Sequence, residues 1–149
     1  MENRLSKENK QLLKITEKSV KKWRTTLQLD PLWDISVEIL DDDIMEGAIA
    51  RVDTSNSEYF VATIEVSTDL SYLPKEKLPD TINEMVCHEL IHIVMIDLFR
   101  TMQLLAGKKE NWSQELRYKY EQFTSRFQRA FVDLDKQLSK AINRTEENA

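Results

Sequence analysis

Two histidines and a glutamate stand inside a strongly hydrophobic stretch of the chain. His88 and His92 are the only histidines among the 149 residues, and Glu89 directly follows the first of them. Residues four apart on a helix lie on the same face, so both imidazoles can bind one ion. Zinc takes such ligands, and catalytic zinc sites keep one position for water. Glu89, about 100° around the helix from His88, would then act as general base towards that water.

The alternative is that the two histidines are hydrogen-bonded core residues. In a helix they would continue one stripe with Met85, Met95 and Phe99. That interpretation must account for three polar groups together in an apolar run. Burying such groups without partners costs several kcal/mol each. The pattern therefore favours a metal site.

The remaining sequence predicts an α+β fold, in which a small, mostly antiparallel sheet packs on the buried helix that carries the motif. The strand-like stretches are rich in β-branched and aromatic residues or alternate apolar with polar side chains, and short turn-forming segments separate them. The helical stretches repeat apolar residues at a period of about 3.6. We expect helices over about 6–29, 78–106 and 111–143, and strands over 33–39, 48–53 and 59–66.

Local signals predict where the helices begin and end. Thr81 and Glu84 have the spacing of a capping box, in which each side chain satisfies a free backbone N–H. Gly107 is expected to stop the motif helix. Asp30-Pro31 is expected to end the first helix, because the residue before a proline is disfavoured in helical conformation.

Length and composition fit a single domain over residues 1–149, with a polar tail at 144–149 that we expect to fray. The formal net charge of −5 argues against non-specific nucleic-acid binding by the whole surface. No apolar run is long enough to span a membrane, and the N-terminus lacks the apolar core of a signal peptide. Cys87 is the single cysteine, which excludes an internal disulfide and fits a reducing compartment. We therefore expect a cytoplasmic protein.

The first helix is rich in lysine and could meet nucleic acid, an acidic partner or a membrane surface. It also carries Glu8 and Glu17, so the favoured interpretation is an ordinary solvated face. The run Asp41-Asp42-Asp43 could bind a cation, but no calcium-loop spacing follows it, and we expect a solvated turn.

The motif segment, His88-Glu-Leu-Ile-His92, resembles the zinc-dependent metallopeptidases of the zincin type. More loosely, the chain from Trp33 to Leu134 is similar in pattern to small metallopeptidases encoded by bacteriophages and prophages. These share an N-terminal helix, a short sheet before the motif helix and a final helix with an acidic residue. The resemblance implies a zincin-like fold and a zinc-dependent hydrolase that cuts a peptide or protein substrate, in the host cytoplasm if phage-encoded. The alternative is a non-catalytic protein on the same scaffold, stabilised by metal, that binds a partner or serves phage assembly or regulation.

The third metal ligand must be a carboxylate or a water, because no further histidine exists. The metzincin pattern is absent, since Met95 and Leu98 stand where it has glycine and histidine. Asp97 is five residues past His92 and is rotated off the ligand face. The remaining candidates lie on the last helix, as in the glutamate zincins: Glu110, Glu115 and Glu121.

Helical geometry does not decide whether Glu115 or Glu121 is the third ligand. Relative to the centre of the expected buried stripe, Glu115 lies about 100° to one side and Glu121 about 140° to the other. The resemblance favours Glu121, because the ligand of the phage-type sequences opens a segment patterned like 121–134. The predicted site is therefore zinc on His88, His92 and Glu121, with Glu89 as general base. The expected stripe comprises Leu116, Tyr120, Phe123, Phe127, Ala130, Phe131 and Leu134.

Overall fold

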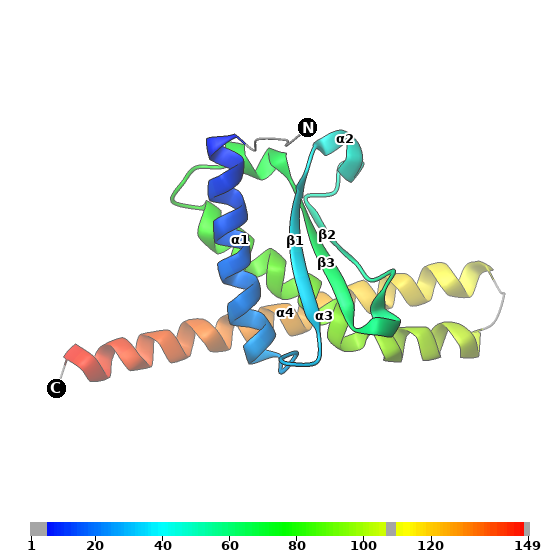
Figure 1. The fold of residues 1–149 in the computed structure, drawn as a ribbon. Coiled ribbons are helices and arrows are strands. Elements are labelled where there is room, and N and C mark those ends of the chain that lie inside the picture. The colour runs from blue at the N-terminus through cyan, green and yellow to red at the C-terminus, as the bar shows by residue number, and fades with distance from the viewer. Residues whose placement is uncertain (1–5, 107–109, 148–149) are drawn as a thin grey trace. The chain divides into compact units, whose positions relative to one another are not determined.

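The computed structural model describes residues 6–106 and 110–147, and its fold is α+β, as expected (Figure 1). In chain order the elements are α1 (Lys7–Thr26), β1 (Asp34–Leu40), α2 (Asp42–Met45), β2 (Ala50–Asp53), η1 (Ser57–Tyr59), β3 (Val61–Ser67), η2 (Thr68–Tyr72), α3 (Leu78–Ala106) and α4 (Glu110–Glu147). The chain divides into two compact units, Met1–Met95 and Ile96–Ala149. Within the described ranges, no helix combines the length and the apolar character that crossing a membrane requires.

The first unit contains a three-stranded mixed sheet with the order β1-β3-β2. β1 pairs with β3 in parallel along its whole length, whereas β2 pairs with β3 antiparallel over four residue pairs. The expectation of a mostly antiparallel sheet is therefore wrong. β1 and β2 follow each other in sequence but do not pair, because β3 lies between them. Residues 41–60 provide the long connection that a parallel pair needs.

The core of this unit lies on one face of the sheet. In the central strand β3, the side chains of Ala62, Ile64 and Val66 are almost fully buried, since alternate residues of a strand face the same side. Further apolar residues of β1 and of α3 up to Met95 are buried as well. These are Ile35, Ile82, Val86, Leu90, Ile91 and Ile93.

The opposite face of the sheet carries polar pairs between neighbouring strands. Arg51 on β2 forms an ion pair with Glu65, its register partner on β3. The hydrogen bond and the charge of Glu65 raise the pKa of Arg51 above its ordinary value. The hydroxyls of Ser36 and Thr63 lie 3.0 Å apart on the neighbouring parallel pair. These pairs bridge adjacent strands on the polar side of the sheet.

Helix α1 lies alongside β1 (Figure 1). The Ser6 side chain caps its first turn by accepting a hydrogen bond from the backbone N–H of Asn9. Trp23, fully buried, donates its indole N–H to the backbone carbonyl and side-chain oxygen of Asn83 on α3, each at 3.0 Å. The helix ends at Thr26, and Gln28 has a φ of 56° in the left-handed region. α1 therefore ends before Asp30-Pro31, not at it as expected.

The helix over 78–106 forms as expected, but its start differs in detail. The backbone N–H of Thr81 donates to the carbonyl of Lys77, as it does inside a helix. Thr81 is therefore not an N-cap, and the expected capping box with Glu84 is wrong. Leu78 and Pro79 occupy the first turn instead, where a proline costs no hydrogen bond. The expected stop at Gly107 lies outside the described residues.

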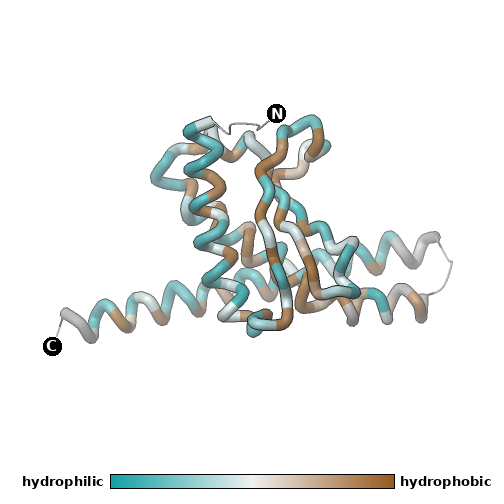
Figure 2. Tube along the Cα trace, in the orientation of Figure 1, coloured by the Kyte–Doolittle hydropathy of each residue, from teal (hydrophilic) through white to brown (hydrophobic). Residues whose placement is uncertain are grey.

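Helix α4 is longer than expected and buries a different stripe. It continues to Glu147, so residues 144–147 are helical where we expected fraying, and 148–149 lie outside the described residues. Thr124 and Val132 are buried, whereas Phe123, Phe127 and Leu134 are 45%, 41% and 51% exposed. The aromatic rings contact one another along the helix, with 4.7 Å between the centroids of Phe123 and Phe127. Hydrophobic residues recur along α4 with hydrophilic ones between them (Figure 2).

Replacing Ile64 by alanine should destabilise the protein by about 2–5 kcal/mol, because the side chain is fully buried and its removal leaves a cavity. Ile49→Ala removes the same atoms from a side chain that is 59% exposed and should cost less than about 0.5 kcal/mol. Urea unfolding of both variants measures the difference. Equal losses would contradict the placement of β3 in the core.

Candidate metal centre

The His88-Glu-Leu-Ile-His92 segment lies near the middle of α3, in the part that belongs to the first unit. Leu90 within this stretch and Val86 just before it are completely buried, and Ile93 just beyond it is 2% exposed. The two histidines are only half-buried. The buried apolar neighbours fix this part of the helix in the core. The two imidazoles are therefore held in place by the helix while remaining partly accessible to solvent.

His88 and His92 face each other across one turn of α3. Their Nε2 atoms are 3.1 Å apart, and the ring planes are inclined at 78° with centroids 4.8 Å apart. Two Zn–N bonds of about 2.0–2.1 Å, opened at a tetrahedral angle, place two nitrogens about 3.3 Å apart. A hydrogen bond between two neutral imidazoles has a similar length. The geometry thus suits a shared metal ion or a direct contact between the rings.

Glu89 is 9% exposed, which is unusual for a carboxylate. It follows His88 by one residue and therefore points about 100° around α3 from that ring. A buried carboxylate beside two half-open imidazoles is costly unless other groups compensate it. Its position suits a base that works on a molecule held next to the histidines.

The neighbouring cysteine is a core residue. Cys87 is completely buried and forms no disulfide. Its burial is typical of a small packing residue. The side chains of Asp97 and Glu110, two further carboxylates considered for the site, lie outside the described part of the chain.

Glu115 and Glu121 both belong to α4 in the second unit, and both are exposed. The observed buried position at Thr124 changes how they compare. Glu121 is three residues from Thr124, which places it about 60° from Thr124 around the helix axis. Glu115 is nine residues from Thr124, which places it about 180° away, on the opposite side of the helix. Within α4, Glu121 therefore borders the buried face and Glu115 points away from it.

A shallow hollow of about 350 Å³ surrounds Glu121 on the second unit. This lining of cationic and hydrogen-bonding residues was not predicted from the sequence. The signal that could have revealed it is the three- and four-residue spacing of these residues around Glu121, which places them on one face of the helix. The side-chain amide of Gln122 donates to the Tyr118 hydroxyl at 2.8 Å. The other lining residues are Ser125, Arg126 and Arg129.

Comparisons of the chain with protein-family models, with curated proteins and with solved structures found no match.

Added zinc should raise the melting temperature of the native protein, because a ligand that binds only the folded state stabilises it by about 2.7 kcal/mol at a hundredfold excess over Kd. His88→Ala and His92→Ala should each abolish this shift. Differential scanning fluorimetry with and without zinc measures it. An unchanged melting temperature in native protein, with no zinc found by elemental analysis, would leave only the direct ring contact.

Proposed function

We propose that the protein is a zinc-dependent peptidase in which His88, His92 and Glu121 hold the ion and Glu89 is the general base. The observation that carries the proposal is the 3.1 Å separation of the two Nε2 atoms on a buried helix, with the buried Glu89 between the histidines in sequence. A direct contact between the rings would explain the distance alone. The proposed general-base role also gives the neighbouring carboxylate a function.

The donor set is one that zinc prefers, namely two imidazole nitrogens and a carboxylate oxygen. In the proposed site, His88 and His92 supply the nitrogens from α3, and Glu121 supplies the oxygen from α4. Glu121 is exposed, and an exposed glutamate side chain can take a ligand position by changing rotamer.

Three protein ligands leave a coordination position for water and substrate, as in catalytic zinc sites. When bound, zinc would polarise the scissile carbonyl and lower the pKa of a water molecule towards neutrality. Glu89 then takes a proton from the attacking water and transfers it to the amine nitrogen as the peptide C–N bond breaks. The carboxylate is thereby restored for the next turnover.

The zincin-like arrangement belongs to the same proposal. A sheet that buries Ala62, Ile64 and Val66 precedes a helix that buries Val86 and Leu90, and both sets of residues belong to the first unit. We expect the sheet to support the motif helix through these apolar faces. The substrate is then a peptide or a segment of a protein.

Replacing Glu89 by glutamine should leave zinc bound but lower peptide hydrolysis by about 10²–10⁴-fold, because the amide has nearly the same shape and cannot accept the proton. Cleavage of a quenched fluorescent peptide library, measured beside zinc content, tests this. Undiminished cleavage by a zinc-loaded variant would rule out the general-base role.

Replacing Glu121 by glutamine should weaken zinc binding by at least about tenfold, since even groups that only orient a ligand contribute 10–100-fold. Glu115→Gln is the matched control on the same helix and should bind zinc as the native protein does. Competition with a chromogenic chelator measures both affinities. The opposite ranking would assign the third ligand to Glu115.

A further inference from the structure

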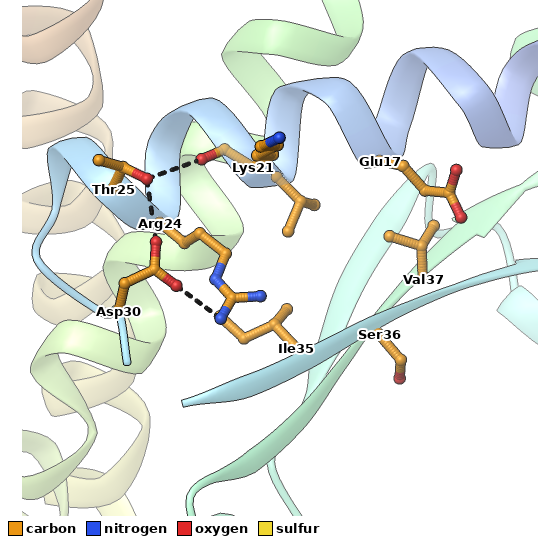
Figure 3. Close-up of a pocket in the computed structure, with 9 residues that line it drawn as sticks. Glu17, Lys21, Arg24, Thr25, Asp30, Ile35, Ser36 and Val37 are labelled. Carbon is orange, nitrogen blue, oxygen red and sulfur yellow. Dashed lines mark hydrogen bonds and ion pairs between the residues drawn. The ribbon is translucent and has the colours of Figure 1, made fainter. Parts of the chain in front are cut away.

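A second hollow of about 540 Å³ lies between α1 and β1 in the first unit (Figure 3). Its volume falls in the range of pockets that bind small ligands, roughly 300–1,000 Å³. None of the residues proposed for the metal centre lines it. The lining residues are Glu17, Val20, Lys21, Arg24, Thr25, Asp30, Ile35, Ser36 and Val37.

The hollow meets the outer edge of β1. Three consecutive residues, Ile35, Ser36 and Val37, line it, although neighbouring side chains of a strand point to opposite faces. In Figure 3, Val37 points towards α1 and Ser36 points away from it. Residues that point to opposite faces of the sheet thus border the same hollow. The hollow therefore lies along the edge of β1 rather than on one face of the sheet.

The backbone along this edge has hydrogen-bonding groups to offer. The N–H of Asp34 donates to the carbonyl of Phe60 beside β3, at 2.8 Å. In a parallel ladder, alternate residues turn both backbone groups to the same neighbour, so Ile35 and Val37 turn theirs to the outer side. β1 is an edge strand, and within the described chain no further strand pairs with it. Such an edge is a template for an added strand.

One end of the hollow carries a fixed cation. The Arg24 guanidinium donates to the Trp33 carbonyl at 3.0 Å and pairs with Asp30 at 2.6 Å, while the Thr25 hydroxyl donates to the same carboxylate at 2.9 Å. The Nε of Arg24 is buried and has no hydrogen-bond partner in the described chain, so one donor is unused.

The charge of α1 is complementary to an acidic ligand. Lys21 is exposed and lines the hollow one helical turn before Arg24. Over its whole length α1 carries seven lysines and arginines against two glutamates, whereas the complete chain has a net charge of −5. Glu17 lies above Val37, away from Arg24 (Figure 3). At the other end Asp30 pairs with Arg24, so Lys21 and the unused Nε–H of Arg24 are the groups that this end offers to an anion.

We propose that this hollow binds an extended acidic peptide segment of a partner protein, separately from the metal centre. The peptide adds a strand to the outer edge of β1 through the backbone groups of Ile35 and Val37. A carboxylate of the peptide lies at the Lys21 and Arg24 end. Backbone pairing supplies affinity for any extended chain, and the Lys21 charge with the unused Nε–H of Arg24 selects an acidic one.

The test uses the full-length protein and a fluorescein-labelled peptide of alternating valine and glutamate, with a valine–lysine peptide as the comparison. Fluorescence anisotropy should show binding of the acidic peptide and none of the basic one. Lys21→Glu should weaken binding by about tenfold or more. Lys18→Glu makes the same charge change at an exposed α1 position outside the hollow and should have less than about a twofold effect.

Two further measurements separate this site from the metal centre. Amide exchange of Ile35 and Val37, followed by NMR on the native protein, should slow when the acidic peptide is added. His88→Ala should bind the peptide as tightly as the native protein does. The proposal is overturned if the acidic peptide fails to bind, if Lys18→Glu weakens binding as much as Lys21→Glu, if His88→Ala abolishes binding, or if neither amide is protected.

Discussion

The main physical constraint on the first unit is that its buried helix α3 carries polar side chains. Glu89 and the two half-buried histidines share α3 with Val86 and Leu90, which are completely buried. Moving a carboxylate from water into such surroundings is strongly unfavourable unless a charge or hydrogen bonds compensate it. A cation held by the two imidazoles would add a favourable charge close to Glu89.

The same helix is held by α1 close to the motif. Trp23 donates its indole N–H to two oxygens of Asn83, five residues before His88. Five residues of helix rise about 7.5 Å, so this contact lies little more than one turn from the first imidazole. A fully buried tryptophan contributes a large apolar area besides its hydrogen bond. Packing in the core thus restricts how the imidazoles can move relative to the sheet.

Features that depend on local sequence were predictable. The helix over 78–106 was clear because its apolar residues surround the motif, and the spacing from His88 to His92 placed both rings on one face. The parallel pairing of β1 with β3 was not predictable, since the short turn-forming segments between the strands suggested a mostly antiparallel sheet. The partner of a strand depends on contacts between distant segments, which the period of one segment does not contain.

The buried stripe of α4 shows the same limit in a helix. Phe123, Phe127 and Leu134 are the most apolar residues at helical spacing, so hydrophobicity alone selected them. The structure buries Thr124 and Val132 and leaves the rings to contact one another along the helix surface. The angular comparison of the two candidate ligands changes with it. Glu121, which only the resemblance favoured over Glu115, borders the face of Thr124, about 60° away. A threonine, whose hydroxyl donates to the Tyr120 carbonyl, gave no signal of burial in the sequence.

The order β1-β3-β2 also gives the sheet an edge strand that faces α1. At the bond that a peptidase cuts, each small pocket contact adds only about 1–3 kcal/mol of discrimination between substrates. A separate contact for an acidic segment would raise the effective concentration of one particular protein at the site. Under both proposals, specificity would come mainly from the β1 edge, and generic peptides without an acidic segment would be poor substrates. The lysines of α1, which in sequence suggested only a solvated face, would then contribute to choosing the substrate.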